Sequence, residues 1–293
     1  MSPPESGREI GRVRAAKINT LDSRPLVVIS CWQPRSDRMK PAAFSKNKEL
    51  NVCGWPAVAA LFARHPEEVR RLFFDPTTGK RAGEFCAQLA QQKKVYRQVP
   101  PAELEKIAGS LHHGGIVAVI GERPMQKVTR EVLAAWGRDR APLLLLDRVG
   151  NANNLGAIVR TAAFFGVSAI VVPDHPAQAA PGEAAFRVAE GGMEFVDFYR
   201  VPALPEFCLE LKRHHFLIGA SLTGHQLTPS EARERGLPRP PAVILGNEEK
   251  GLAPGVAAGC DRLVRIPGTD AVQSLNVSAA AAVLCWEFFG RRG

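Results

Sequence analysis

The stretch 242–289, AVILGNEEKGLAPGVAAGCDRLVRIPGTDAVQSLNVSAAAAVLCWEFF, decides the fold of this chain. It contains two short apolar runs, Ala242–Leu245 and Leu263–Ile266, and each opens directly into a glycine-containing loop. Short uninterrupted apolar runs are typical of buried parallel strands. Strand ends that open into such loops at one edge are where open α/β sheets bind ligands. The stretch therefore predicts an α/β fold with a cofactor site at this edge.

The same pattern occurs upstream. Leu143–Leu146 is predicted to be a buried strand that ends at Asp147, and a helix follows after a polar loop. Apolar residues recur along that helix at the spacing of one buried face, namely Leu155, Ile158, Val159 and Ala162. On the other face we expect Gly156 to leave room beside Arg160, and we expect Gly166 to end the helix. Further strands are expected at Val167–Val172, Phe195–Tyr199 and Phe216–Ala220, and helices at Ala184–Glu190 and Leu204–Arg213.

The last helix, expected over Asn276–Phe289, is apolar nearly all round. Such a helix is predicted to be buried. Because it closes the chain, part of that burial is expected to be against a second subunit.

Composition narrows the class of protein. The chain has 293 residues, 45% of them hydrophobic, which suits two domains that each bury a core. None of the six cysteines is paired at C-x-x-C spacing, so neither a zinc site nor a disulfide framework is expected. The sequence has no run near the roughly 20 apolar residues of a membrane span, and its N-terminus does not read as a signal peptide. These features predict a cytoplasmic protein without a metal.

Charge is distributed unevenly along the chain. Residues 1–140 hold 24 Lys+Arg against 14 Asp+Glu, whereas residues 141–293 hold 14 against 15. A basic front half predicts a polyanion partner, and RNA or DNA is favoured over a merely soluble basic surface. An anionic membrane would require an amphipathic helix, which the sequence does not display.

We divide the chain into a basic, largely disordered arm (1–48), a small α/β domain (49–120), a linker (121–141) and a larger α/β domain (142–293). In the small domain, helical periodicity is expected from Val52 to Phe62 and from Pro101 to Leu111. Tyr96 lies among basic residues and could stack on RNA, but a half-buried tyrosine on a strand is the favoured interpretation.

Common nucleotide and hydrolase motifs are excluded. No G-x-G-x-x-G follows a predicted strand, and neither G-x-S-x-G nor H-E-x-x-H occurs. Gly246–Gly251 has the glycine spacing of a Walker A loop, but Leu252 and Ala253 stand where that motif requires Lys and Ser or Thr.

Three segments carry a family resemblance. Asn-Leu-Gly-Ala-Ile-Val-Arg-Thr-Ala (154–162), Leu-Gly-Asn-Glu-x-x-Gly-Leu (245–252) and Ile-Pro…Ser-Leu-Asn-Val-Ser (266–278) resemble, in order and spacing, the motifs of SpoU or TrmH-like RNA ribose methyltransferases of the SPOUT superfamily. The segment 54–61, GWPAVAAL, more weakly resembles the ribosomal-protein-like substrate-binding domain that such enzymes often carry.

The resemblance implies a parallel sheet with a C-terminal trefoil knot, bound S-adenosylmethionine, and a homodimer with the site near its interface. It implies methyl transfer to a ribose 2′-OH of tRNA or rRNA. Arg160 would be the central catalytic residue, acting either as a base or as a stabiliser of oxyanion charge. The residues implied to orient Arg160 and the ribose are Asn154, Glu248, Ser274 and Asn276. Those implied to hold the cofactor are Gly246, Asn247, Ile266 and Leu275.

Simpler roles remain open for single residues. Asn154 or Ser274 could cap a helix, Glu248 could be a solvated loop charge, and Asn276 could form a local turn. The chain also departs from the family pattern, at Asn151, Ala152, Gly268 and Asp270. The competing function is a non-catalytic RNA-binding protein that keeps the fold.

Overall fold

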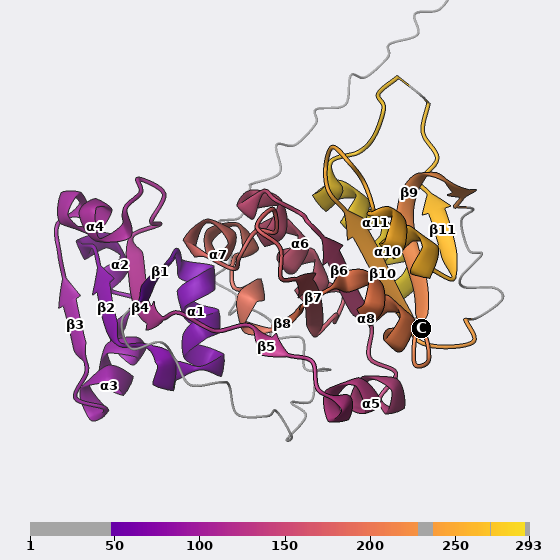
Figure 1. The fold of residues 1–293 in the computed structure, drawn as a ribbon. Helices are drawn as coiled ribbons and strands as arrows, with labels where there is room; N and C mark the ends of the chain where they lie inside the picture. The colour runs from indigo at the N-terminus through magenta and orange to yellow at the C-terminus, as the bar shows by residue number, and fades with distance from the viewer. Residues whose placement is uncertain (1–47, 228–236, 270, 291–293) are drawn as a thin grey trace, which may run out of the picture. The chain divides into compact units, whose positions relative to one another are not determined.

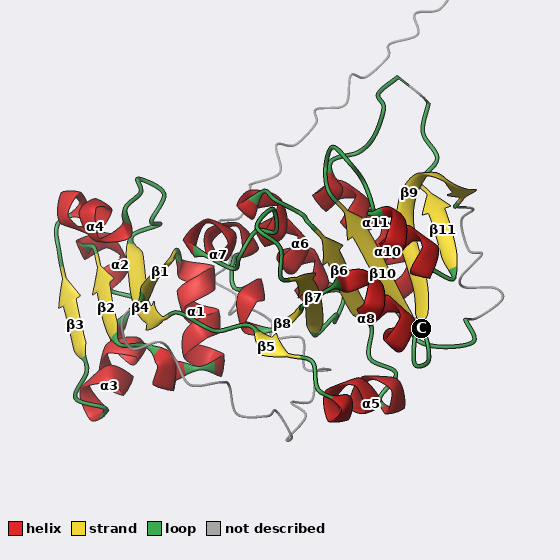
Figure 2. Ribbon diagram, viewed as in Figure 1, coloured by secondary structure: helices red, strands yellow, loops and turns green. Residues whose placement is uncertain are grey.

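The structure is a computed structural model that describes residues 48–227, 237–269 and 271–290 (Figure 1). These residues belong to one compact unit that contains two β-sheets (Figure 2). The predicted basic arm, apart from its last residue, and Asp270 lie outside the described residues.

The first sheet is four-stranded, with the order β1-β4-β2-β3. β4 pairs antiparallel with β1 and β2, and β3 adds to β2 in parallel. Its strands are β1 (Glu49–Cys53), β2 (Arg71–Phe74), β3 (Val95–Gln98) and β4 (Ile116–Gly121). Its helices are α1 (Trp55–Arg64), η1 (Pro66–Glu68), α2 (Pro76–Gly79), α3 (Gly83–Gln91) and α4 (Pro101–Ala108). The small α/β domain expected here is present.

Three expectations for this domain are wrong in detail. Val52 and Cys53 belong to β1, because their backbone pairs with β4. The helix α1 begins only after Gly54, whose φ of 92° is outside the helical region. Tyr96 is 43% exposed rather than half-buried, because β3 is an edge strand whose four residues are all exposed. α4 also ends earlier than expected, at the left-handed Gly109.

The second sheet has seven strands in the order β11-β9-β10-β6-β7-β8-β5, and every neighbouring pair is parallel. Its strands are β5 (Gln126–Lys127), β6 (Leu143–Asp147), β7 (Ala169–Pro173), β8 (Asp197–Val201), β9 (Phe216–Gln226), β10 (Pro241–Gly246) and β11 (Arg262–Arg265). Its helices are α5 (Arg130–Arg138), α6 (Ala152–Phe164), α7 (Glu183–Ala189), η2 (Gly192–Glu194), α8 (Leu204–Leu211), α10 (Pro254–Gly259) and α11 (Val277–Phe289). The predicted parallel sheet is confirmed. The order of the strands does not show whether the chain passes through a loop of its own backbone, so the trefoil knot stays a prediction.

β9 is longer than the sequence predicted. It continues beyond Ala220 to Gln226, and its register against β11 shifts so that Leu263 pairs with Gly219 while Val264 pairs with His225. The polar residues between Gly219 and His225 gave no apolar signal for a strand. Pairing with β11 therefore extends β9 through residues whose sequence pattern does not predict a strand.

α6 buries the apolar face that its periodicity predicted, from Leu155 to Ala162. The expectation for Gly156 is wrong. A Cβ on Gly156 would lie 2.6 Å from the Ala185 carbonyl oxygen and 2.8 Å from the Val188 Cβ. The glycine therefore allows α7 to approach α6 closely and makes no room for Arg160.

α11 is only partly buried. Leu284 and Cys285 are fully covered, whereas Val283 is 38% exposed and Trp286 is 57% exposed. Within one chain, α11 packs on α6 and β10 with one side only, and the expected burial of its other side against a second subunit stays a prediction. Neither α11 nor any other helix in the described ranges combines the length and apolarity that a bilayer crossing requires.

A buried ionic cluster joins the small domain to the parallel sheet. Arg123 lies between β4 and β5, and its guanidinium donates to Glu68 of η1 and to Glu194 of η2, each at 2.6 Å. The two carboxylate side chains are only 4% and 1% exposed. Burial lowers the pKa of Arg123, but the charges and hydrogen bonds of Glu194 and Glu68 outweigh it and raise that pKa. The guanidinium therefore stays charged and compensates both acids.

We expect Arg123→Met to destabilise the protein by about 3–5 kcal/mol, because it removes the guanidinium from two buried carboxylates and leaves the ring of His65, 4.0 Å from each, as a weaker partner. Urea unfolding followed by circular dichroism measures the loss. Arg138→Met is the matched control, since Arg138 is 72% exposed and should change stability by no more than about 0.5 kcal/mol. Equal stability of the two variants would contradict the importance of the cluster.

Candidate active site at the carboxyl edge of the parallel sheet

Three loops meet at the edge where β6 and β10 end. β10 pairs with β6 in register, with Gly246 opposite Asp147, so both strands finish at the same level. The loop after β6 leads into α6, the loop after β10 covers Gly246–Gly251, and the third loop leads into α11. The segments 245–252 and 266–278 include the second and third of these loops, and the segment 154–162 lies in α6, directly after the first loop.

The Asn154 side chain links all three loops. Its Nδ2 donates to Glu248 Oε1 at 2.9 Å, and its Oδ1 accepts from Asn276 Nδ2 at 3.1 Å. One amide thus uses its donor and its acceptor on two different motifs, 94 and 122 residues away in sequence. The predicted site residues Asn154, Glu248 and Asn276 are brought together.

Glu248 is held as a carboxylate. Its second oxygen, Oε2, accepts from the Gly150 backbone N–H at 3.3 Å. Partial burial raises the pKa of Glu248, but the hydrogen bonds from Asn154 and from backbone N–H groups outweigh it, and the pKa lies below its ordinary value. The carboxylate therefore serves as a hydrogen-bond acceptor that ties the β6 loop to the β10 loop.

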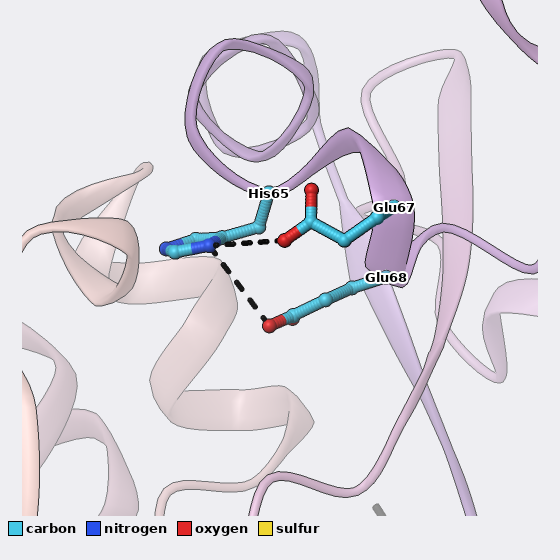
Figure 3. Close-up of side chains that lie close together, drawn as sticks. All are labelled: His65, Glu67 and Glu68. Carbon is cyan, nitrogen blue, oxygen red and sulfur yellow. Dashed lines mark ion pairs between the residues drawn. The ribbon is translucent and has the colours of Figure 1, made fainter. Parts of the chain in front are cut away.

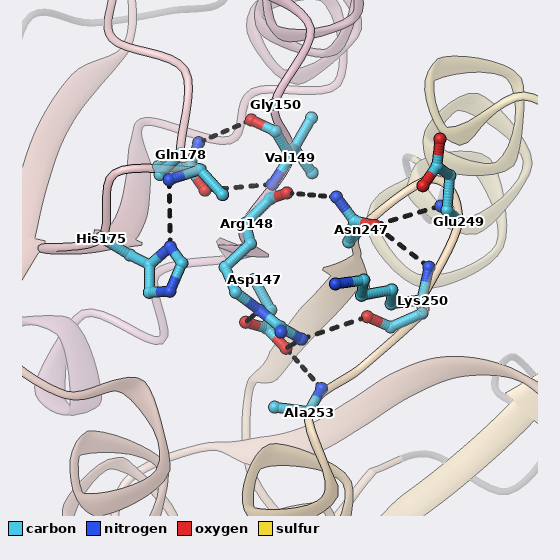
Figure 4. Close-up of polar contacts among 12 residues, drawn as sticks. Asp147, Arg148, Val149, Gly150, His175, Gln178, Asn247, Glu249, Lys250 and Ala253 are labelled. Atoms are coloured by element: carbon cyan, nitrogen blue, oxygen red, sulfur yellow. Dashed lines mark hydrogen bonds and ion pairs between the residues drawn. The ribbon is translucent and has the colours of Figure 1, made fainter.

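Asn247 shapes its own loop (Figure 4). Its Nδ2 donates to the Arg148 carbonyl at 2.9 Å, while its Oδ1 accepts from the backbone N–H groups of Glu249 and Lys250 at 3.1 and 3.0 Å. Its backbone also pairs with Gly251. The Asn247 side chain therefore holds the fold of the loop and ties it to the loop after β6.

Gly246 is required by the tight return of this loop. A Cβ there would lie 2.5 Å from the Leu252 backbone nitrogen and 2.6 Å from the Gly251 carbonyl oxygen. Any other residue would push the two arms of the loop apart. Glycine is required here for the close approach of the loop's own backbone, and the expected role of Gly246 in holding a cofactor stays a prediction.

Supporting residues of this edge were missed by the sequence reasoning. Asp147 accepts from the Ala253 backbone N–H at 2.6 Å and from Arg148 Nε at 2.7 Å. Gln178 accepts from the Val149 backbone N–H at 3.1 Å and donates to the Val149 carbonyl at 3.2 Å. Figure 4 shows these groups around the β6 loop. The position of Asp147 at a strand end was the available signal, whereas nothing in the sequence pointed to Gln178.

The predicted apolar cofactor contacts lie on the third loop. Leu275 is 48% exposed, and its neighbour Val272 is 72% exposed. Ile266 is half-buried, and Gly246 is half-buried at the end of β10. Exposed apolar side chains at a sheet edge fit the apolar part of a small ligand. The chemistry of these residues is thus compatible with S-adenosylmethionine.

Two of the simpler roles are now settled by geometry. Asn151, rather than Asn154, caps α6, since its Oδ1 accepts from the backbone N–H groups of Asn153 and Asn154. Asn276 does cap α11, because its Oδ1 accepts from the Ser278 backbone N–H at 2.8 Å. Its Nδ2 remains available for Asn154.

Arg160 and Ser274 stand outside this network. Ser274 is exposed, and no hydrogen bond between described residues joins it to Asn154, Glu248 or Asn276. Arg160 lies further along α6, where its Nη2 pairs with Glu190 Oε2 at 3.0 Å. Within one chain the network does not touch Arg160, so the expectation that it orients this arginine stays a prediction.

One group of possible metal ligands exists among the described residues, away from this edge. Ligand atoms of His65, Glu67 and Glu68 all lie within 4.8 Å of one another (Figure 3). Glu68, however, already binds Arg123 at 2.6 Å. Its other oxygen, Oε1, faces the His65 ring at 4.0 Å, so we describe the group as one side of the ionic cluster.

Comparison with known proteins decides the family. A model of the SpoU rRNA methylase family matches residues 141–286, and a model of the RNA 2′-O ribose methyltransferase substrate-binding domain matches residues 51–126. The chain is also 34% identical to the 23S rRNA (guanosine-2′-O-)-methyltransferase RlmB of Acinetobacter baylyi, over 80% of this chain and 94% of that protein. The chain belongs to the SpoU rRNA methylase family. The recognition made from the three motifs is confirmed, and the methyltransferase interpretation is favoured over a non-catalytic RNA-binding protein.

Further SpoU relatives agree. An uncharacterized tRNA/rRNA methyltransferase, YfiF of Escherichia coli O157:H7, is 32% identical over 83% of this chain and 68% of its own length. The crystal structure of the SpoU methyltransferase AviRb from Streptomyces viridochromogenes, in complex with AdoMet, superposes with a TM-score of 0.65. That match covers 82% of this chain and 89% of AviRb at 24% identity, and it supports the shared fold.

We expect Asn154→Ala to raise the pKa of Glu248 toward its ordinary value, because the carboxylate loses a hydrogen bond. Carbon-detected NMR titration of Glu248 measures this shift, with Asn153→Ala as the control at an exposed neighbouring position. Since the folded-state pKa is depressed, ionised Glu248 stabilises the fold above its unfolded pKa, near 4.3, and that contribution is lost as pH falls through the folded-state value. A pKa unchanged in Asn154→Ala would contradict the bridge.

Proposed function

We propose that this protein transfers a methyl group from S-adenosylmethionine to the ribose 2′-OH of a guanosine in ribosomal RNA, within the cytoplasm. The observation that carries the proposal is the junction of the three SpoU motif loops through the Asn154 amide. The named RlmB relatives act on guanosine of 23S rRNA, which favours rRNA over tRNA as the substrate. The basic residues 1–140 supply the charge that RNA binding requires.

RNA binding and methyl transfer are assigned to the regions that contain the first and the second sheet. We assign RNA binding to residues 49–120 and methyl transfer to residues 142–293, joined by the segment 121–141. The exposed edge strand β3 carries Tyr96 and Arg97, so it offers a stacking surface and a positive charge to RNA.

The cofactor would be held by the loop after β10 and by the loop before α11. Gly246 and Asn247 would present backbone groups, while Ile266 and Leu275 would cover its apolar part. When bound, S-adenosylmethionine supplies an electrophilic methyl group. The AdoMet complex of AviRb, which shares the fold, supports this assignment.

Arg160 is assigned the role of stabilising charge on the ribose oxygen. A guanidinium stays charged in proteins, which makes it a poor base but a good donor to an oxyanion or to the adjacent phosphate. The side chain is 59% exposed and can reach a macromolecular substrate. Asn154, Glu248, Ser274 and Asn276 would complete the site around the ribose.

A homodimer would bring these parts together. Phe164 of α6 is 78% exposed, and Val283 and Trp286 of α11 are also exposed, on two helices that pack on each other. Arg160 precedes Phe164 by four residues and so lies on the same face of α6. If a second copy covers this apolar face, Arg160 is carried to the subunit boundary, where it can serve the loops of the partner.

The catalytic assignment predicts that Arg160→Ala lowers methyl transfer by at least about 10²-fold, since one charged donor to the developing oxyanion is lost. Transfer of radiolabelled methyl from S-adenosylmethionine to unmodified 23S rRNA measures the rate, and calorimetry checks that the cofactor still binds. Arg213→Ala, at an exposed position in the turn after α8, is the charge-matched control. RNA binding without any transfer by the unaltered protein would establish the non-catalytic alternative.

The dimer assignment predicts that Phe164→Glu yields a monomer, because two buried carboxylates would face each other across the axis. Sedimentation equilibrium measures the mass, with Leu209→Glu as control. Leu209 is similarly exposed, at 64%, on α8, where its replacement should leave the association unchanged. A monomeric unaltered protein at micromolar concentration would reject the assignment.

A further inference from the structure

The contact between Arg160 and Glu190 is not explained by the network at the sheet edge. Arg160 Nη2 and Glu190 Oε2 are 3.0 Å apart, and their side chains are 59% and 48% exposed. An exposed ion pair contributes only about 0–1 kcal/mol, so it can hold a guanidinium in one orientation without locking it. The pair is also open to a large polyanion.

The backbone around Glu190 is built to hold this carboxylate in place. Glu190 ends α7 in the left-handed conformation, with φ 45° and ψ 48°, which residues other than glycine rarely adopt. Gly191 follows with φ 93°, and a Cβ there would lie 2.9 Å from the Pro56 carbonyl oxygen of α1. A Cβ on Gly192 would lie 3.1 Å from the Arg160 Cα. The turn is thus wedged between α1 and α6, and such strained positions persist where their surroundings over-determine them.

The same turn is anchored at its other end. Glu194 follows within η2, and its buried carboxylate binds Arg123 at 2.6 Å. Residues 190–194 therefore cannot swing away when a ligand approaches Arg160. A negatively charged ligand must therefore bind close to the Glu190 carboxylate, or it must replace that carboxylate as the partner of the Arg160 guanidinium.

We propose that Glu190 is a positioning residue for Arg160. The Glu190 carboxylate binds the Arg160 guanidinium until a phosphate of the RNA backbone replaces it. The inference rests on the proposed function for the identity of the anion. Phosphate suits the exchange, because it offers the guanidinium a bidentate, doubly charge-assisted contact. Glu190 stays beside the bound phosphate and repels it, so the carboxylate lowers RNA affinity and favours RNA whose backbone fits Arg160 closely.

The test compares Glu190→Gln with Glu210→Gln in the full-length protein, with affinity for unmodified 23S rRNA measured by filter binding at low salt. Both substitutions remove one negative charge, but Glu210 lies exposed on α8, away from the pair. Glu190→Gln should bind this RNA about two- to fivefold more tightly than Glu210→Gln does, as expected for the loss of an exposed charge contact. Gln keeps the size of the side chain, and thermal unfolding checks that both variants fold.

A second pair of variants shows whether the effect acts through Arg160. In an Arg160→Gln background, Glu190→Gln and Glu210→Gln should bind the RNA equally, because no guanidinium remains to be exchanged. Equal affinities with Arg160 intact, or an advantage of Glu190→Gln that persists without Arg160, would overturn the inference. Methyl transfer is assayed separately on the same RNA. If the unaltered protein transfers no methyl while the affinities follow the expected pattern, the exchange at Arg160 is upheld and only the methyl-transfer proposal is rejected.

Discussion

The in-register pairing of β6 with β10 is the constraint on which the site depends. It sets Asp147 opposite Gly246, so that two loops nearly 100 residues apart in sequence start from the same level of the sheet. Once they do, short side chains suffice to connect them: Asn154 reaches Glu248, and Asn247 reaches the Arg148 carbonyl. A slip of one residue in this pairing would move these contacts out of hydrogen-bond range.

Charge is used in two contrasting ways around this sheet. The Arg123 cluster is buried, and its cost of desolvation is offset only while both carboxylates keep their guanidinium, so it acts as a fixed joint between the two sheets. The Arg160–Glu190 pair is exposed and contributes little free energy, which suits a contact that a ligand exchanges. Glu194 and Glu190 lie on one short turn, and that turn therefore couples the fixed joint to the exchangeable pair.

Apolar exposure is also concentrated where function is expected. Leu275 and Val272 face solvent on the loop beside the cofactor residues, and Phe164 and Trp286 do so on the paired helices α6 and α11. Both sets are surfaces that a single chain leaves open. A small molecule and a second subunit, respectively, have the size to cover them.

The sequence by itself determined the parallel sheet, most element positions, the three motif loops and the family, because buried strands and helix faces leave a periodic apolar pattern and motif spacing is written in the chain. It failed where local pattern and long-range pairing disagree. Val52 looked helical but pairs with β4. β9 was expected to end at Ala220 but continues to Gln226 beside β11, and Gly156 allows α7 to approach α6. Only the tertiary structure decided that Asn154 bridges two distant motifs and that Glu190, in a strained turn, faces Arg160. Hydrogen bonds and ion pairs between side chains far apart in sequence leave no periodicity, so they become visible only when the backbone has placed both partners.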